Sequence, residues 1–279
     1  MLKPEVFKQS MQAIDAFGAN PTMLVKVAKL ANDPDTDTAT VCDLLRNDGP
    51  LAAGIIRISN SPYYAPVVPH GNLSSAVSQI GMRELIRVVN LHQAQHLFAH
   101  DLPGYGIAAL DHWKASLAAA LVMEASAKLS GLDSEDAFTI GILHAIGRVL
   151  INHVVRKRNS IPPWDGHQPV EEWERNAVGF DYAEAGAMLL EHWHFPPATC
   201  KIILWQLNPE PTIEPLSMQG SLQFAKRLLA VTGVDFAGDA GRLPMTDPYV
   251  GAAGLNPEQV AQLVADCRRE FLRVLKAAV

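Results

Sequence analysis

Apolar residues recur at spacings of three and four along most of the chain, which is the period of an amphipathic α-helix. The clearest run extends from Leu110 to Leu129 and is followed by Gly131, a residue type that commonly ends helices. A second run extends from Val260 to Val274, after Asn256 and Pro257, which favour the start of a helix. The pattern therefore predicts one long helix in the middle of the chain and another at its C-terminal end.

The segment Ala137–Ile151 differs because it is apolar nearly all round. Its polar exceptions are Thr139, His144 and Arg148. A helix without a polar face must be buried on most sides, so we expect this segment to form a single helix in the core.

Strand signals are missing from the pattern, since no run alternates between apolar and polar residues and no Asn-Gly turn separates apolar segments. We therefore expect an all-α fold. A short Pro/Gly stretch at Asp101–Gly106 is too short for a flexible linker, so the two halves should pack together. The predicted organisation is a helical subdomain at 1–102, a second at 107–232, and a loop and helix at 233–279 that pack on the core.

Composition narrows the class of protein. Of the 279 residues, 48% are hydrophobic and 19% are charged, which suits a sizeable core and excludes a disordered chain. The net charge of -6 weakens any attraction to nucleic acid or anionic membranes, so we expect neither as a partner. Cys42, Cys200 and Cys267 lie far apart without a CxxC motif, which is typical of a reducing compartment. We see no apolar leader and no membrane span, so the expected location is the cytoplasm.

Motifs for common chemistries are missing, including the phosphate-binding loop, GxGxxG, GxSxG and HExxH. His92, His96 and His100 are spaced four apart and would line one helical face, a spacing that can bind a metal. No carboxylate or cysteine accompanies them. We expect a stripe that faces solvent or a partner.

One segment resembles a known family. Residues 137–150 read AFTIGILHAIGRVL, which resembles the GLLHDIG core helix of HD-superfamily phosphohydrolases, and specifically the HDOD (HD-related output domain) proteins of bacterial signalling. Four more segments resemble HDOD motifs in the same order: the opening helix (21–30), the DPxLxxxLLRxxNS signature (47–61), the AIxxLG turn (75–81) and DHAEVGAxLLxxWxLP (180–196). The resemblance covers roughly residues 20–230. It implies an HD-domain/PDEase-like multi-helix bundle with an N-terminal helical subdomain packed against it.

HD phosphohydrolases hold metal ions with His and Asp ligands and use them to activate water. The positions that match this cage are Ala115, His144, Ala145, Tyr182, Gln206 and Leu207. Of these positions, only His144 keeps a residue type that the family uses as a metal ligand. A lone imidazole cannot hold a catalytic divalent ion. His112, one turn before Ala115, is the possible substitute ligand. The resemblance therefore implies a degenerate HD-like subdomain at 107–232, with no catalytic residue, no metal and no cofactor.

The remaining signature residues have structural explanations. They are Asn60, Ser61, Gly81, Gly141, Gly147, Gly186 and Trp193. Asn60 and Ser61 precede Pro62 and should stop a helix, because proline cannot continue it and asparagine tolerates left-handed geometry. Gly141 and Gly147 should allow neighbouring helices to approach closely.

These observations predict a non-catalytic scaffold for signal transduction that acts on an unidentified protein partner in a bacterial signalling pathway. One alternative is a divergent HD-type metal-dependent phosphohydrolase or cyclic-dinucleotide phosphodiesterase with relocated ligands. Another is a small-molecule sensor that uses the emptied cage as its pocket. A nucleic-acid-binding regulator is disfavoured by the net charge. Metal bound to the purified protein would favour the enzyme.

Overall fold

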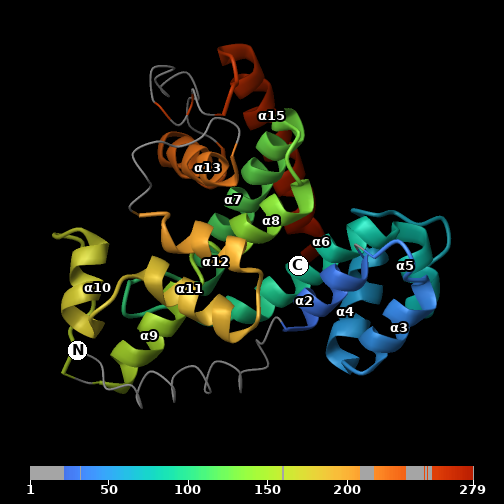
Figure 1. The fold of residues 1–279 in the computed structure, drawn as a ribbon, viewed down its shortest axis with the longest axis horizontal. Helices are drawn as coiled ribbons and strands as arrows, with labels where there is room; N and C mark the ends of the chain where they lie inside the picture. Colours follow the sequence, from blue (N-terminus) through green and yellow to red (C-terminus); the bar gives the residue numbers. More distant parts are fainter. Residues whose placement is uncertain are drawn as a thin grey trace.

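The fold is all-α, as predicted. The computed structural model describes residues 22–31, 33–158, 160–207, 217–236, 248, 250 and 253–278. Helices dominate this described part, and its only β-type pairing is one isolated bridge between Leu102 and Ile107. Figure 1 shows the helices in two groups that meet near α6 and α7.

The N-terminal helices gather at one end of the molecule, drawn in blue to teal in Figure 1. They are α2 (Thr22–Ala31), α3 (Thr38–Arg46), α4 (Gly49–Ser59), α5 (Leu73–Ile80) and α6 (Met82–Leu97). Helix α6 contacts α2, α4 and α5 and also packs on α8, so it joins this group to the rest of the chain.

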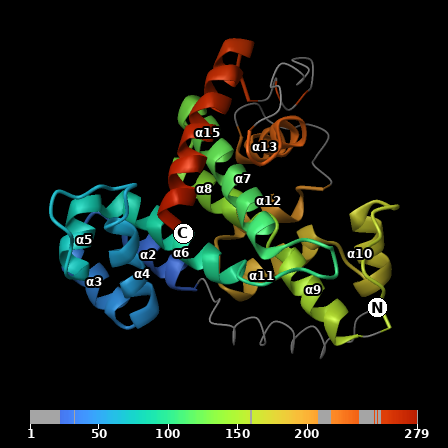
Figure 2. The ribbon, with the colours of Figure 1, turned by 180° about the vertical axis from the view of Figure 1, so that it is seen from behind.

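The larger group contains the degenerate cage positions. Its helices are α7 (Ala109–Ser130), α8 (Ser134–Leu143), α9 (Gly147–Lys157), α10 (Val170–Val178), α11 (Tyr182–His192), α12 (Pro197–Leu204), α13 (Met218–Thr232) and α15 (Pro257–Ala278). Helix α7 ends at Gly131 with a left-handed backbone (φ 71°), as predicted. Asn256 Oδ1 accepts a hydrogen bond from the Gln259 N–H (2.9 Å) at the predicted start of α15. Figures 1 and 2 both show α15 beside α7.

The expectation of one continuous helix over 137–151 is wrong. The chain forms α8 and α9 with a turn at residues 144–146 between them. Two backbone hydrogen bonds in this turn join residues three apart instead of the four of an α-helix. The Ile146 N–H donates to Leu143 O (3.0 Å), and the Arg148 N–H donates to Ala145 O (3.1 Å). The hydrophobic period continues through the turn because both helices are buried, so the pattern carries no sign of the break.

The segment Ser134–Lys157, which contains α8 and α9, is long and apolar enough to cross a membrane if length and composition alone are considered. In the fold, 72% of the apolar window in Ser134–Lys157 is buried. A helix buried by its neighbours in this way suits the core of a soluble protein.

Two glycines lie where backbones nearly touch. A Cβ on Gly141 in α8 would lie 2.5 Å from the Cα of Ala120 in α7. A Cβ on Gly147, at the start of α9, would lie 1.9 Å from the carbonyl oxygen of Tyr182 and 2.6 Å from the Gly186 nitrogen in α11. Any side chain at these positions would force the helices apart.

Arg87 of α6 connects the N-terminal helices to the larger group. Its side chain is 10% exposed and donates to Glu124 of α7 (3.2 Å) and to Glu270 of α15 (2.7 Å). Tyr63 also donates a hydrogen bond to Glu270. The predicted boundaries at 1–102, 107–232 and 233–279 stay predictions, and parts of each range lie outside the described residues.

The expected solvent-facing histidine stripe is wrong at His92. Its side chain is 7% exposed, and Gly54 of α4 lies so close that a Cβ there would be 2.1 Å from His92 Nδ1. Burial is the main cause that lowers the pKa of His92 to about 4. His96 is exposed, and His100 follows the end of α6.

Asn60 ends α4 in a different way from the one expected. Its backbone is right-handed (φ -89°) rather than left-handed. The Asn60 side chain accepts from His70 N (2.7 Å) and donates to His70 O (2.9 Å), which closes the intervening loop. The residues with positive φ in this region are Ala65 (φ 40°) and Gly81 (φ 83°), which lies between α5 and α6.

We predict that Gly141→Ala lowers the free energy of unfolding by about 1–3 kcal/mol, because the new methyl group would push α8 away from Ala120. Gly49→Ala is the matched control, since nothing lies within 4 Å of its Cβ position in α4. The control should be neutral or slightly stabilising. Urea unfolding of both variants measures the difference, and equal effects would contradict the packing explanation.

Candidate functional site

His144 lies in the turn between α8 and α9 and is partly buried. Its Nδ1 lies 2.7 Å from the carbonyl oxygen of Gly141. Burial lowers the pKa of His144 to about 4, against the opposing effect of the Gly141 hydrogen bond, and the positive charges of Lys226 and Arg148 add to the lowering. The imidazole is therefore neutral at pH 7.

Gln206, just after α12, connects His144 to α13. It is 1% exposed, and its Nε2 donates to the carbonyl oxygen of His144 (2.8 Å). The Gln206 backbone oxygen accepts from Gln223 Nε2 (2.8 Å) and from Lys226 Nζ (3.0 Å). Gln206 thus links the turn to α13.

Tyr182 is the first residue of α11, a helix capped by Asp181 and Glu184 in a capping box. The Tyr182 side chain lies near two cations. The guanidinium carbon of Arg148 is 4.6 Å from the ring centroid, and Lys226 Nζ is 3.4 Å from the Tyr182 hydroxyl. Burial raises the pKa of Tyr182 to about 12, so the phenol keeps its proton at neutral pH.

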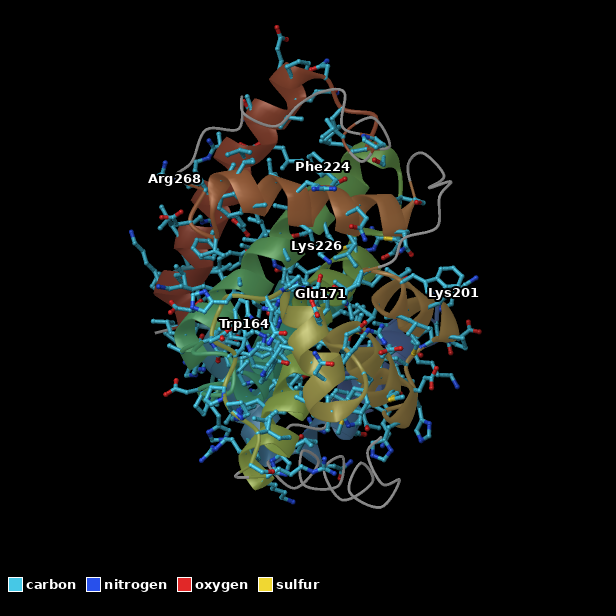
Figure 3. All side chains as sticks on the ribbon, turned by 90° about the vertical axis from the view of Figure 1, so that its left-hand side faces the viewer. Trp164, Glu171, Lys201, Phe224, Lys226 and Arg268 are labelled. Carbon is cyan, nitrogen blue, oxygen red and sulfur yellow. The ribbon has the colours of Figure 1, made fainter. Side chains whose placement is uncertain are left out.

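Arg148 and Lys226 have no salt bridge to any carboxylate in the described part of the chain. Arg148 Nε is buried without a hydrogen-bond partner there. Burial lowers the pKa of Lys226 to about 8, and the charge of Arg148 acts in the same direction while that of Glu171 opposes it. Figure 3 shows Lys226 on α13 and Glu171 on α10 close together on one face of the molecule.

Glu174 of α10 contacts the backbone of Tyr182 and is fully buried. It accepts hydrogen bonds from the Tyr105 hydroxyl (2.7 Å) and from the Tyr182 backbone N–H (2.9 Å). Burial raises the pKa of Glu174 to about 7, although these hydrogen bonds and the charge of Arg148 lower it. The Glu174 carboxyl group therefore carries only part of a negative charge at neutral pH.

His112 on α7 completes this region. It is 2% exposed, and its ring packs 4.4 Å from that of Phe98. Neither ring nitrogen has a hydrogen-bond partner in the described residues. Burial lowers the pKa of His112 to about 3, and the charges of Arg148 and His144 add to this, against a weaker opposing effect of the Ala145 backbone.

The side chains at the cage positions do not fit a metal ion. Ala115, Ala145 and Leu207 carry no ligating atom, and the Tyr182 phenol is protonated. His112 and His144 are the two imidazoles that remain. In the described part of the chain, no three His, Cys, Asp or Glu side chains gather as a metal site requires.

Arg148, Lys226, Tyr105 and Glu174 did not emerge as site residues from the sequence. Arg148 was visible as a polar exception in an apolar segment. Lys226 gave no signal, because its place in the site depends on contacts with residues far away in the chain.

The helical bundle, with His144 in a turn held against α11 and α12, defines a protein of the HD-like all-α class. The HDOD domain family profile matches residues 18–209. The chain belongs to the HDOD family.

Solved structures of bacterial proteins share this fold. A candidate phosphohydrolase from Shewanella amazonensis is 26% identical, with 97% of this chain and 98% of that one covered and a TM-score of 0.72. An HDOD domain protein with unknown function from Geobacter sulfurreducens is 20% identical, with 95% of this chain and 97% of that one covered and a TM-score of 0.70. A candidate signal transduction protein from Marinobacter aquaeolei is 22% identical, with 93% of this chain and 58% of that one covered and a TM-score of 0.70. No curated protein matches the chain.

The buried histidines predict acid sensitivity. Because the pKa of His112 is lowered to about 3 in the folded protein, the unfolded chain, with a histidine pKa of about 6.5, binds more protons below that pH. This histidine should therefore cost about 2 kcal/mol of stability between pH 7 and pH 5. Urea unfolding at the two pH values should show a smaller loss for His112→Phe than for the wild type. An unchanged loss would mean that His112 is protonated in the fold.

Proposed function

We propose that this HDOD protein is a non-catalytic signal-transduction scaffold that acts by binding a protein partner. Family membership supports a role in signalling. The observation that carries the non-catalytic part is the charge around His144. Arg148 and Lys226 flank the former cage, where a metal enzyme needs anionic or neutral ligands.

The repulsion between a metal ion and the two cations, Arg148 and Lys226, is large enough to matter. Two unit charges about 4 Å apart repel by about 1 kcal/mol in water and about 4 kcal/mol near a protein surface. A divalent ion doubles each of these interactions with Arg148 and Lys226. Without carboxylate ligands to offset the repulsion, such an ion is unfavourable here, and the water activation that it supplies is lost.

A metal-dependent phosphohydrolase or cyclic-dinucleotide phosphodiesterase is the second candidate. Two observations favour it. The Shewanella amazonensis protein is named as a candidate phosphohydrolase. His112 and His144 lie close enough to interact electrostatically, so two imidazoles remain near the cage. A cytoplasmic location and the absence of nucleic-acid and membrane partners belong to the scaffold proposal and rest on composition.

Metal analysis distinguishes these functions. The protein purified without added ions should carry well under one equivalent of Mn, Fe, Mg or Zn, and should not hydrolyse phosphodiester, nucleotide or nitrophenyl-phosphate substrates. Elemental analysis and hydrolysis assays in the presence of each metal measure this. Stoichiometric metal that disappears in His144→Ala would overturn the proposal in favour of the enzyme.

We expect His144→Ala to act mainly on stability, because it removes the contact with Gly141 and opens a small cavity in the turn. A loss of about 1–3 kcal/mol should lower the melting temperature by several degrees. In pull-downs from the native cell, analysed by mass spectrometry, partner recovery should follow the folded fraction.

Val41→Ala in α3 is the control, since Val41 is fully buried and remote in sequence from the cage. It should lower partner recovery as much as His144→Ala does at an equal loss of stability. Unchanged melting with lost binding in His144→Ala alone would give the last cage residue a direct functional role.

A further inference from the structure

The emptied cage contains several buried polar atoms that lack a partner. In the described residues, no hydrogen bond reaches Nε of Arg148 or Oε1 of Gln206, and the ring nitrogens of His112 have no partner of ordinary hydrogen-bond geometry. These side chains come from α7, α9 and the end of α12, and each interacts with His144 through charge or a hydrogen bond. Buried polar atoms are nearly always satisfied in folded proteins, so a group of unsatisfied ones marks a place where a polar ligand or ordered water can bind.

The charge in this region is also unbalanced. The charge of Arg148 lowers the pKa of Lys226, and neither side chain has a salt bridge in the part of the chain that is described. Glu171 offsets part of the charge of Lys226, while the buried Glu174 is only partly ionised at neutral pH. Two like charges held together in a partly buried site are costly unless an anion accompanies them.

We propose that the emptied cage binds the phosphate group of a small ligand directly, with Arg148 and Lys226 supplying the positive charge. The guanidinium group offers a planar pair of donors that matches phosphate, and the ammonium group adds a point charge. Two cations match the charge of about -1.5 to -2 that a phosphate monoester carries near pH 7. The inference goes beyond the scaffold function, which does not require it.

Neighbouring side chains complete the match to phosphate. The Tyr182 hydroxyl accepts from Lys226 and keeps its own proton, so it can donate to a phosphate oxygen. Gln206 Oε1 can accept from a protonated phosphate oxygen. Glu171 lies near Lys226 on α10 and offsets part of the positive charge, which disfavours a long polyanion such as nucleic acid.

Calorimetric titration tests this proposal with inorganic phosphate and with glycerol 3-phosphate, at constant ionic strength held with sodium chloride. The wild-type protein should bind at least one of them saturably. Arg148→Met and Lys226→Gln should each weaken binding by about 10-fold or more, because each loses a charged hydrogen-bond donor. Arg227→Gln is the matched control, since Arg227 is the next residue on α13 and is exposed. It should change affinity by less than about 2-fold.

Thermal unfolding without phosphate separates binding from folding. Lys226→Gln removes a cation from a partly buried site, so its melting temperature should equal or exceed that of the wild type. Tighter binding of glycerol 3-phosphate than of phosphate would identify an organic phosphomonoester as the ligand class, and equal binding would identify free phosphate. No saturable binding, or an equal loss in Arg227→Gln, would overturn the proposal. Either result leaves the metal analysis, and hence the scaffold function, to be judged separately.

Discussion

Direct backbone contact between α9 and α11 is the constraint on which the site depends. At Gly147 a Cβ would lie 1.9 Å from the Tyr182 carbonyl oxygen, so only glycine permits this approach. Arg148 follows immediately, and the short distance between the helices brings its guanidinium to 4.6 Å from the Tyr182 ring. Gly141 has the same role one helix earlier, where α8 meets α7. The packing of the core and the assembly of the cationic cluster are therefore one physical requirement.

Burial then decides the charge of the cluster. It favours the uncharged form of every titratable group, so His112 and His144 lose their protons while Tyr182 keeps its own. Glu174 is half neutralised for the same reason. Arg148 supplies the guanidinium group of the cluster, close to the Tyr182 ring. The region around His144 is thus positive in this chain, and its charge follows from a few side chains.

The sequence was sufficient for the all-α class, the family, and helix ends such as Gly131 and Asn256, because these depend on local pattern and local capping. It was insufficient where long-range packing decides. The turn at residues 144–146 is invisible to periodicity, since both flanking helices are buried. The spacing of His92 identifies its helical face, but only the fold shows that Gly54 covers it. Lys226 joins the site through contacts with residues more than 15 positions away in the chain.

Helix α7 belongs to both halves of the structure. Near its start His112 faces the emptied cage, and further along Glu124 binds Arg87 of the N-terminal group. A rigid helix that touches both regions provides a continuous path between them, but contact alone does not produce regulation. A ligand in the cage can change partner binding only if its affinity differs between two arrangements of the helices. The Arg87 ion pairs join α6, α7 and α15 at one point, and they hold the N-terminal group in the arrangement seen here.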